Sequence, residues 1–310
     1  MKVLSFLPLL LRGPLLRPAR LSSTLIRATA LELVILAGHV LIYPSGIAPE
    51  RRPSTPRPVP GTGTGTGKDT GAESNPEHGA GHDEITRAAE ATALPTTGDA
   101  RPPVVLLHGL IDNRSVFVLL RRSLARHGWR HLASLNYSPL TCDIRTAAEL
   151  LDRHVEEICA RTGHHEVDIV GHSLGGLIAR YYVQRLGGDR RVRTLVTLGT
   201  PHGGTSAVPL AGAHPIVRQM RSGSELIEEL RRPAPGCRTR FVSFWSELDR
   251  VILPVETACV DHPDLDAVNV RVTGIGHLAL PVHPAVASAI RQALESDGSD
   301  VGTRGAAHVA

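Results

Sequence analysis

Between residues 101 and 296 the chain alternates between short apolar runs and longer stretches whose apolar residues recur every three or four positions. Several runs are apolar at every position, which is typical of parallel strands buried on both faces. The runs predict six strands, at 103–109, 131–137, 166–171, 192–199, 239–245 and 268–274. Helical spacing covers 115–127, 144–162, 174–186, 225–231 and 283–294. The pattern predicts an α/β fold: a mostly parallel six-stranded sheet with helices on both faces.

Composition fits a globular protein with one large domain, since 42% of the 310 residues are hydrophobic and 21% are charged. Only 3% are aromatic, so the core must consist mainly of Val, Leu, Ile and Ala. The net charge is +4, but the basic residues are scattered among 30 acidic ones. Nucleic-acid binding needs a clustered basic surface, so we expect no nucleic-acid partner.

The first 48 residues have the pattern of an export segment. Five basic residues precede the first acidic one, Glu32, and residues 33–43 carry no charge. A basic leader followed by an apolar segment is typical of a secretion signal. A membrane anchor needs about 20 apolar residues, a length that this segment reaches only marginally. We expect residues 1–48 to be a signal or an anchor, with the folded domain outside the membrane; a buried N-terminal helix of the domain is the alternative.

Residues 49–100 are rich in Pro, Gly, Thr and charge and predict a disordered linker, as residues 297–310 predict a disordered tail. The repeat GTGTGTGK at 61–68 is no phosphate-binding loop. The motif needs a glycine where Thr62 stands and a Ser or Thr where Asp69 stands.

The stretch VDIVGHSLGG, residues 167–176, places a serine where a predicted strand meets a predicted helix. Gly171, Ser173 and Gly175 have the G-x-S-x-G spacing of a nucleophile elbow. So sharp a turn leaves no room for flanking side chains and presents Ser173 Oγ at the sheet edge. It also puts the N–H of Leu174 at a helix N-terminus, where it can stabilise an oxyanion. A plain glycine-rich turn is the alternative.

A nucleophilic serine needs a histidine base and a carboxylate that orients it, carried on loops after later strands. Asp249, in SELDRVILP, follows the strand predicted at 239–245, and His277, in IGHLALP, follows the one at 268–274. These two residues are the predicted acid and base.

Other residues compete for these roles. Glu247 lies on the same loop as Asp249, and Asp261 and Asp264 lie further along the chain. His202 follows another strand but comes before the acid in the chain, and the ring of His172 should point away from Ser173.

The second oxyanion donor is expected on the loop after the first strand, in LLHGLIDN. Gly109 lets the backbone turn in closely there. The N–H of Leu110 is the first candidate and that of Ile111 the next. His108 is expected to support the loop by hydrogen bonding.

Five motifs occur in order along the chain: HGL, VDIVGHSLGG, VTLGTPHGGT, the Asp249 loop and GIGHLALP. With them the chain resembles the bacterial triacylglycerol lipases and esterases of the α/β-hydrolase fold, especially the small ones with a minimal sheet. The resemblance implies that Ser173 is the nucleophile, Asp249 the acid, His277 the base, and Leu110 and Leu174 the oxyanion donors. It also implies a lipid or ester substrate at a membrane or lipid interface, no cofactor and no metal. We expect a monomer. An acyltransferase or thioesterase with the same residues, or a non-catalytic lipid-binding relative, are the alternatives.

Two further features depart from the minimal pattern or add to it. The stretch 205–235 is longer than in the smallest members, and its helix at 225–231, capped by Ser224, is either a partial lid or a surface cover.

The four cysteines of an exported chain suggest disulfides. Cys237 and Cys259 bracket the Asp249 loop and are the expected pair. Cys142 and Cys159 can bridge only if Cys142 folds back along a helix, and Cys159 as a buried thiol is the alternative.

Overall fold

The computed structural model describes residues 27–38, 101–137, 142–207, 214–296 and 307–309. The linker predicted at 49–100, and the leader apart from residues 27–38, lie outside these ranges.

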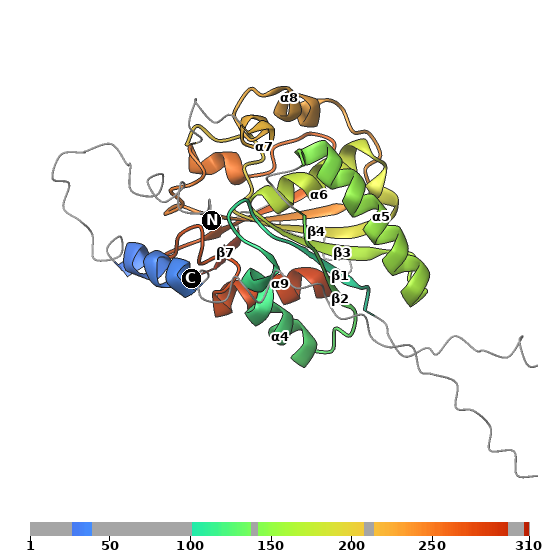
Figure 1. Ribbon diagram of the computed structural model, residues 1–310, viewed down its shortest axis with the longest axis horizontal. Coiled ribbons are helices and arrows are strands. Elements are labelled where there is room, and N and C mark those ends of the chain that lie inside the picture. Colours follow the sequence, from blue (N-terminus) through green and yellow to red (C-terminus); the bar gives the residue numbers. More distant parts are fainter. Residues whose placement is uncertain (1–26, 39–100, 138–141, 208–213, 297–306, 310) are drawn as a thin grey trace, which may run out of the picture. The chain divides into compact units, whose positions relative to one another are not determined.

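Seven strands form one sheet in the order β2-β1-β3-β4-β5-β6-β7, and every neighbouring pair is parallel (Figure 1). The strands are β1 (Val104–Leu107), β2 (Leu132–Leu135), β3 (Val167–His172), β4 (Val192–Leu198), β5 (Arg240–Ser246), β6 (Asp266–Val272) and β7 (Ala307–Val309). All six predicted strands form, and the predicted α/β architecture is confirmed. The prediction of a fully disordered tail is wrong at residues 307–309, which pair with Val270, Arg271 and Val272.

Helices cover both faces of the sheet (Figure 1). They are α4 (Val118–Arg126) and α9 (Pro284–Glu295) on one face and α5 (Ile144–Thr162) and α6 (Leu174–Arg185) on the other. Side chains alternate along β1, so that Val105 and Leu107 pack with α5 and α6 while Val104 and Leu106 pack with α4 and α9. The strands are therefore buried on both sides, as their unbroken apolar runs indicate.

The stretch 205–235 contributes two short helices, α7 (Pro215–Gln219) and α8 (Glu225–Arg231). Their apolar residues are buried in the cluster that also holds α5 and α6. Ser224 caps α8, as predicted, by accepting a hydrogen bond from the N–H of Ile227 at 3.3 Å. The Glu229 carboxylate binds Arg145 of α5 at 2.8 Å and the Tyr181 hydroxyl of α6 at 3.0 Å. The described part of this stretch packs on α5 and α6 as a surface cover. Residues 208–213 lie outside the described ranges. The described ranges also contain the 3-10 helices η2 (Arg114–Phe117), η3 (Gly188–Arg190) and η4 (Val255–Ala258).

Residues 27–38 are helical. Ala28 is buried, and Ile35 packs against the cluster that holds α4 and α9. This part of the leader thus packs on the domain, as the alternative interpretation expects, and export stays a prediction. None of the helices in the described ranges has the length and apolar character needed to cross a bilayer.

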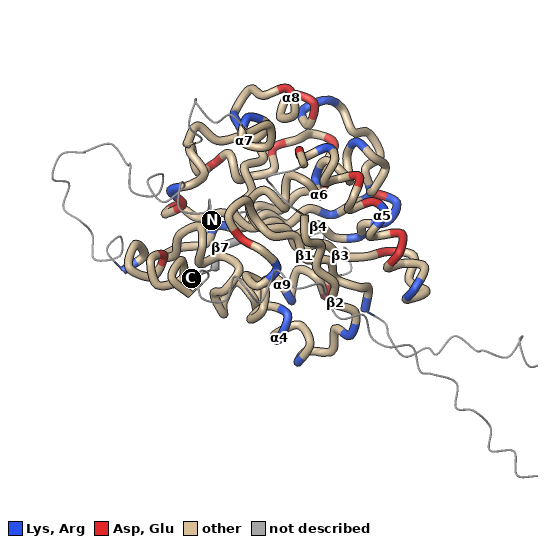
Figure 2. The backbone as a smooth tube through the Cα atoms, viewed as in Figure 1, with Lys and Arg blue, Asp and Glu red and all other residues tan. Residues whose placement is uncertain are grey.

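Charged residues of both signs are interspersed over the described elements, for example along α5 and α8 (Figure 2).

All four cysteines are free thiols, so the predicted disulfides are wrong. Cys159 is buried on the core face of α5, which is the alternative left open for it, and Cys142 and Cys237 pack against the same cluster. An even number of cysteines does not show that any two of them lie close enough to bond. The thiols instead pack in or against the core as small apolar side chains.

Candidate active site

The elbow forms where the sequence places it. β3 ends at His172, α6 begins at Leu174, and Ser173 between them has φ 53° and ψ −117°. Among the described residues it is the only non-glycine residue with a positive φ. Strained backbone of this kind persists only where the surrounding structure enforces it. The turn around it is tight, because a Cβ atom added at Gly171 would lie 2.6 Å from the N atom of Gly176.

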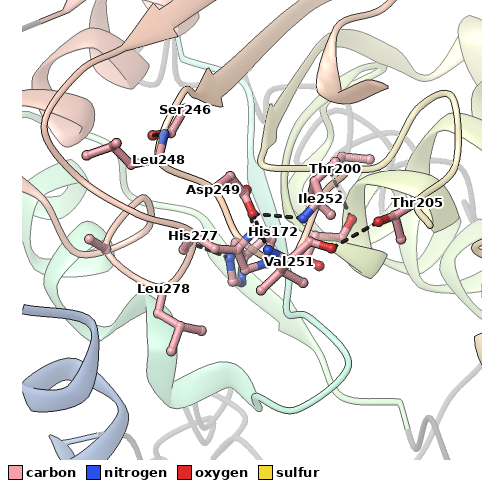
Figure 3. Close-up of polar contacts among 12 residues, drawn as sticks. His172, Thr200, Thr205, Ser246, Leu248, Asp249, Val251, Ile252, His277 and Leu278 are labelled. Atoms are coloured by element: carbon pink, nitrogen blue, oxygen red, sulfur yellow. Dashed lines mark hydrogen bonds and ion pairs between the residues drawn. The ribbon is translucent and has the colours of Figure 1, made fainter. Parts of the chain in front are cut away.

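Asp249 and His277 come together at the ends of β5 and β6 (Figure 3). Asp249 Oδ2 lies 2.7 Å from His277 Nδ1. Asp249 Oδ1 accepts hydrogen bonds from the N–H groups of Val251 at 2.8 Å and Ile252 at 2.9 Å. Both side chains are almost completely buried, so the carboxylate has a fixed position behind the imidazole.

The environment of His277 raises its pKa above the ordinary value. Burial alone would lower the pKa of His277, but the charge of Asp249 and its hydrogen bond raise it. The charges of Glu32 and Asp112 raise it as well, so the net shift is upward. The imidazolium form is therefore favoured by negative charge on several sides.

The competing residues have other partners. Glu247 forms an ion pair with Arg271, and Asp264 accepts a hydrogen bond from the N–H of Ala234 at 2.8 Å. His202 Nε2 lies 3.0 Å from Thr197 Oγ1, and burial lowers the pKa of His202 well below its ordinary value. Asp261 is exposed. In the described ranges no group of three or more His, Cys, Asp or Glu side chains could hold a metal ion.

Ser173 is linked to His277 through shared neighbours. No hydrogen bond joins Ser173 Oγ to His277 among the described residues, although such contacts are often loose before substrate binds. The backbone of Ser173 donates to Leu198 O at 2.8 Å and accepts from Thr200 Oγ1 at 3.0 Å. Gly199 lies between these two, and a Cβ atom there would come within 2.9 Å of His277 Nδ1. The end of β4 therefore contacts the serine and the histidine together.

The loop after β1 passes close to the serine. A Cβ atom at Gly109 would lie 3.4 Å from Ser173 Cβ and only 3.1 Å from Asp112 Oδ2, so a side chain there would be tightly confined. In the part of the chain that the structure describes, neither the N–H of Leu110 nor that of Leu174 donates to another backbone group. His108 supports this loop, as predicted: its Nδ1 lies 2.9 Å from Gly109 O, and its ring stacks on Tyr137 with centroids 4.3 Å apart.

The sequence does not predict a series of polar contacts that joins these loops. Asp112 Oδ2 lies 3.0 Å from His172 Nδ1, and His172 Nε2 lies 3.3 Å from His277 O. The rings of His172 and His277 are 4.9 Å apart (Figure 3). His172 thus connects the loop after β1 to the backbone of the candidate base. No local pattern in the sequence indicates this connection, since the partners lie 60 and 105 positions apart.

Comparison with known proteins identifies similar chains. A model of the palmitoyl protein thioesterase family matches residues 103–234. A triacylglycerol lipase of Burkholderia plantarii is 31% identical over 135 residues, which are 41% of this chain and 37% of that one. A triacylglycerol lipase of Pseudarthrobacter phenanthrenivorans is 30% identical over 117 residues, 36% of each chain. The matches span little more than a third of the length of these curated relatives.

Solved structures share the architecture. Aspergillus fumigatus lipase B has a TM-score of 0.57 at 16% identity, over 65% of this chain and 54% of its own. A Bacillus licheniformis lipase in its mature form has a TM-score of 0.55 at 16% identity, over 63% of this chain and 92% of its own. Together with the parallel sheet, the elbow after β3 and the loops after β5 and β6, these likenesses confirm that the chain has the α/β-hydrolase fold.

Proposed function

We propose that this chain is a serine hydrolase that cleaves carboxylic ester bonds of lipids through an acyl-serine intermediate. The observation that carries the proposal is the buried contact of Asp249 with His277, beside a strained serine at the start of α6. A binding protein has no need for this combination. The lipases among the similar chains support the class of reaction.

The first half of the proposed reaction acylates the serine. Ser173 Oγ attacks the ester carbonyl carbon while His277 Nε2 takes the hydroxyl proton. The N–H groups of Leu110 and Leu174 donate to the oxyanion of the tetrahedral intermediate. As the C–O bond breaks, the imidazolium gives its proton to the leaving alcohol, and Asp249 stabilises the imidazolium throughout.

The second half releases the acid. His277 removes a proton from a water molecule, which attacks the acyl carbon, and the imidazolium then returns a proton to Ser173 Oγ. The chain's own residues supply every proton transfer in this scheme, so it requires no cofactor.

The substrate class is the finer part of the proposal. Triacylglycerols are the first candidate, because two similar chains are triacylglycerol lipases. A thioesterase is the second, because the palmitoyl protein thioesterase model matches the elbow region. Rates on a glyceride series and on matched ester and thioester substrates of equal acyl length would separate them.

We also propose that the chain acts outside the cytoplasm on lipid at a membrane surface. The basic and apolar pattern of residues 1–48 supports this location, and because residues 27–38 pack on the domain, we propose export without removal of these residues. Fractionation of cells that produce the full chain tests it: ester hydrolysis confined to the cytosol would contradict export.

The nucleophile gives the most direct test. Ser173→Ala should remove ester hydrolysis and labelling by a fluorophosphonate probe, since Ser173 Oγ is the atom that carries the acyl group in this scheme. Loss of a nucleophile of this kind lowers kcat by about 10⁶-fold. The variant should unfold at a temperature close to wild type, because only a hydroxyl is lost. Near wild-type hydrolysis by Ser173→Ala would refute the proposal.

A further inference from the structure

We propose that the helix at residues 27–38 is a working part of the active site, and that Glu32 is a positioning residue that fixes the loop carrying His277. The inference rests on the proposed function, because it gives His277 the role of base. It goes beyond that function by making part of the leader necessary for full activity.

Two hydrogen bonds join Glu32 to the residues that follow the histidine. Glu32 Oε2 accepts from the N–H of Leu278 at 3.0 Å, and Glu32 Oε1 accepts from the N–H of Ala279 at 3.0 Å. Both donors belong to residues that are only 1% exposed. A carboxylate that takes two successive N–H groups at the start of a turn acts as a cap and fixes the turn's orientation.

Glu32 also contacts the residue before the histidine. A Cβ atom at Gly276 would lie 2.7 Å from Glu32 Cδ. The carboxyl group therefore lies directly against the backbone on both sides of His277. The helix itself is anchored on the domain by Ala28 and Ile35, so it holds Glu32 on a packed support.

The loop is also held by His172, whose Nε2 lies 3.3 Å from His277 O. Four titratable groups thus surround the candidate base: Asp249, Asp112, His172 and Glu32. The negative charge of Glu32 helps to raise the pKa of His277. Burial raises the pKa of Glu32 itself, and its two backbone hydrogen bonds and His277 act against this rise.

A chain that loses the leader would lose this support. A cleavage after residue 48 would leave the sheet and the three proposed catalytic residues intact but remove Glu32 from the loop. We infer that the active form retains residues 27–38, held on the domain.

The test uses the full chain and p-nitrophenyl butyrate as a soluble ester. Glu32→Ala should lower kcat by about 10- to 100-fold with little change in KM, because a misplaced base impairs the chemical step. Glu32→Gln should retain more of kcat, since its amide oxygen still accepts a hydrogen bond, but it removes the charge. The acid limb of its kcat/KM profile should therefore move to lower pH. Ala30→Gln, at an exposed position of the same helix, is the matched control and should behave as wild type.

A second variant displaces the carboxyl group from the other side. Gly276→Ala places a methyl group where the Glu32 side chain lies, and it should lower kcat as Glu32→Ala does. If both act through one contact, the double variant should lose no more than the worse single variant.

Two results would overturn the inference. One is an unchanged kcat in Glu32→Ala. The other is an equal loss in Glu32→Ala and Glu32→Gln with an unmoved pH profile, which would mean that the helix only stabilises the fold. Failure of the proposed function is distinct, because it would appear as ester hydrolysis that persists in Ser173→Ala.

Discussion

Asp249 divides its two carboxylate oxygens between two tasks. Oδ1 accepts the N–H groups of Val251 and Ile252, which fixes the carboxylate, and Oδ2 faces His277 Nδ1 (Figure 3). The arrangement leaves Nδ1 as a donor, so Nε2 of a neutral His277 is free to accept a proton. A carboxylate is needed for this, because an amide in the same place can turn its NH₂ group toward the ring.

Asp249→Asn should therefore lower kcat by about 10⁴-fold, through loss of the charge and selection of the wrong tautomer. The pH dependence has a defined sign. His277 must be neutral to act as base, and Asp249 raises its pKa, so wild-type activity falls as pH drops through a value above that of an ordinary histidine. In the variant the pKa falls and the acid limb of any residual kcat/KM moves to lower pH, as a pH series would measure.

Glu247→Gln is the control for this prediction. Glu247 lies on the same loop but pairs with Arg271, so the change should leave kcat/KM within about twofold of wild type. A large loss in Glu247→Gln together with an active Asp249→Asn would reverse the two assignments.

At the scale of single residues, the sequence predicts the contact of Asp249 with His277 because both follow strands whose carboxyl ends meet at one edge. It does not predict Asp112, His172 or Glu32 as their partners. The Glu32 contacts span 246 and 247 positions, and they depend on the placement of a helix that has no pattern linking it to the sheet. Such contacts follow from tertiary packing alone.

At the scale of elements, the elbow is fixed by how closely α6 approaches the strands. A Cβ atom at Gly175 would collide with the carbonyl oxygen of Leu107 in β1 and lie 2.7 Å from His108 O. Backbone atoms of a strand that is paired on both sides, as β1 is with β2 and β3, cannot easily move aside. The glycines of the motif therefore serve helix–sheet packing as well as the turn.

Gly175→Ala should consequently destabilise the domain by about 1–3 kcal/mol or more. Urea unfolding would measure the change in the free energy of unfolding. Gly203→Ala is the matched comparison, because its methyl group would lie no closer than 3.2 Å to Thr257 Cβ, a tight contact but not a collision with backbone. Equal stability of the two variants would contradict this account of the elbow.

Elements with a clear apolar pattern could be predicted, and two short ones without such a pattern could not. The helix at 144–162 has the predicted bounds, since its apolar stripe extends over many turns. α7 has five residues and β7 has three. These are too few to show the apolar repeat of a helix or the alternation of a strand. β7 also exists only through its pairing with β6, which residues 307–309 cannot indicate by themselves.

At the scale of the whole molecule, two apolar clusters on opposite faces of the sheet hold the domain together without covalent links. The thiols are also poorly disposed to oxidise. Burial raises the pKa of Cys159 and Cys237, and burial with the nearby Glu256 and Asp261 raises the pKa of Cys259 to about 11. Because the thiolate is the reactive form, Cys159, Cys237 and Cys259 should oxidise slowly, and Cys142 is also a free thiol.

The chain should therefore give four reactive thiols in denaturant after purification without reductant. Its Tm should be the same with and without dithiothreitol. A disulfide between Cys237 and Cys259 would close a loop of about 20 residues and contribute about 3 kcal/mol, or roughly 6–12 °C in Tm for a domain of this size. A Cys237→Ser, Cys259→Ser double variant serves as the control, since its Tm must be insensitive to reductant. Two thiols instead of four, with a Tm that reductant lowers in wild type alone, would mean that this pair forms a bridge and that the acid loop is covalently restrained.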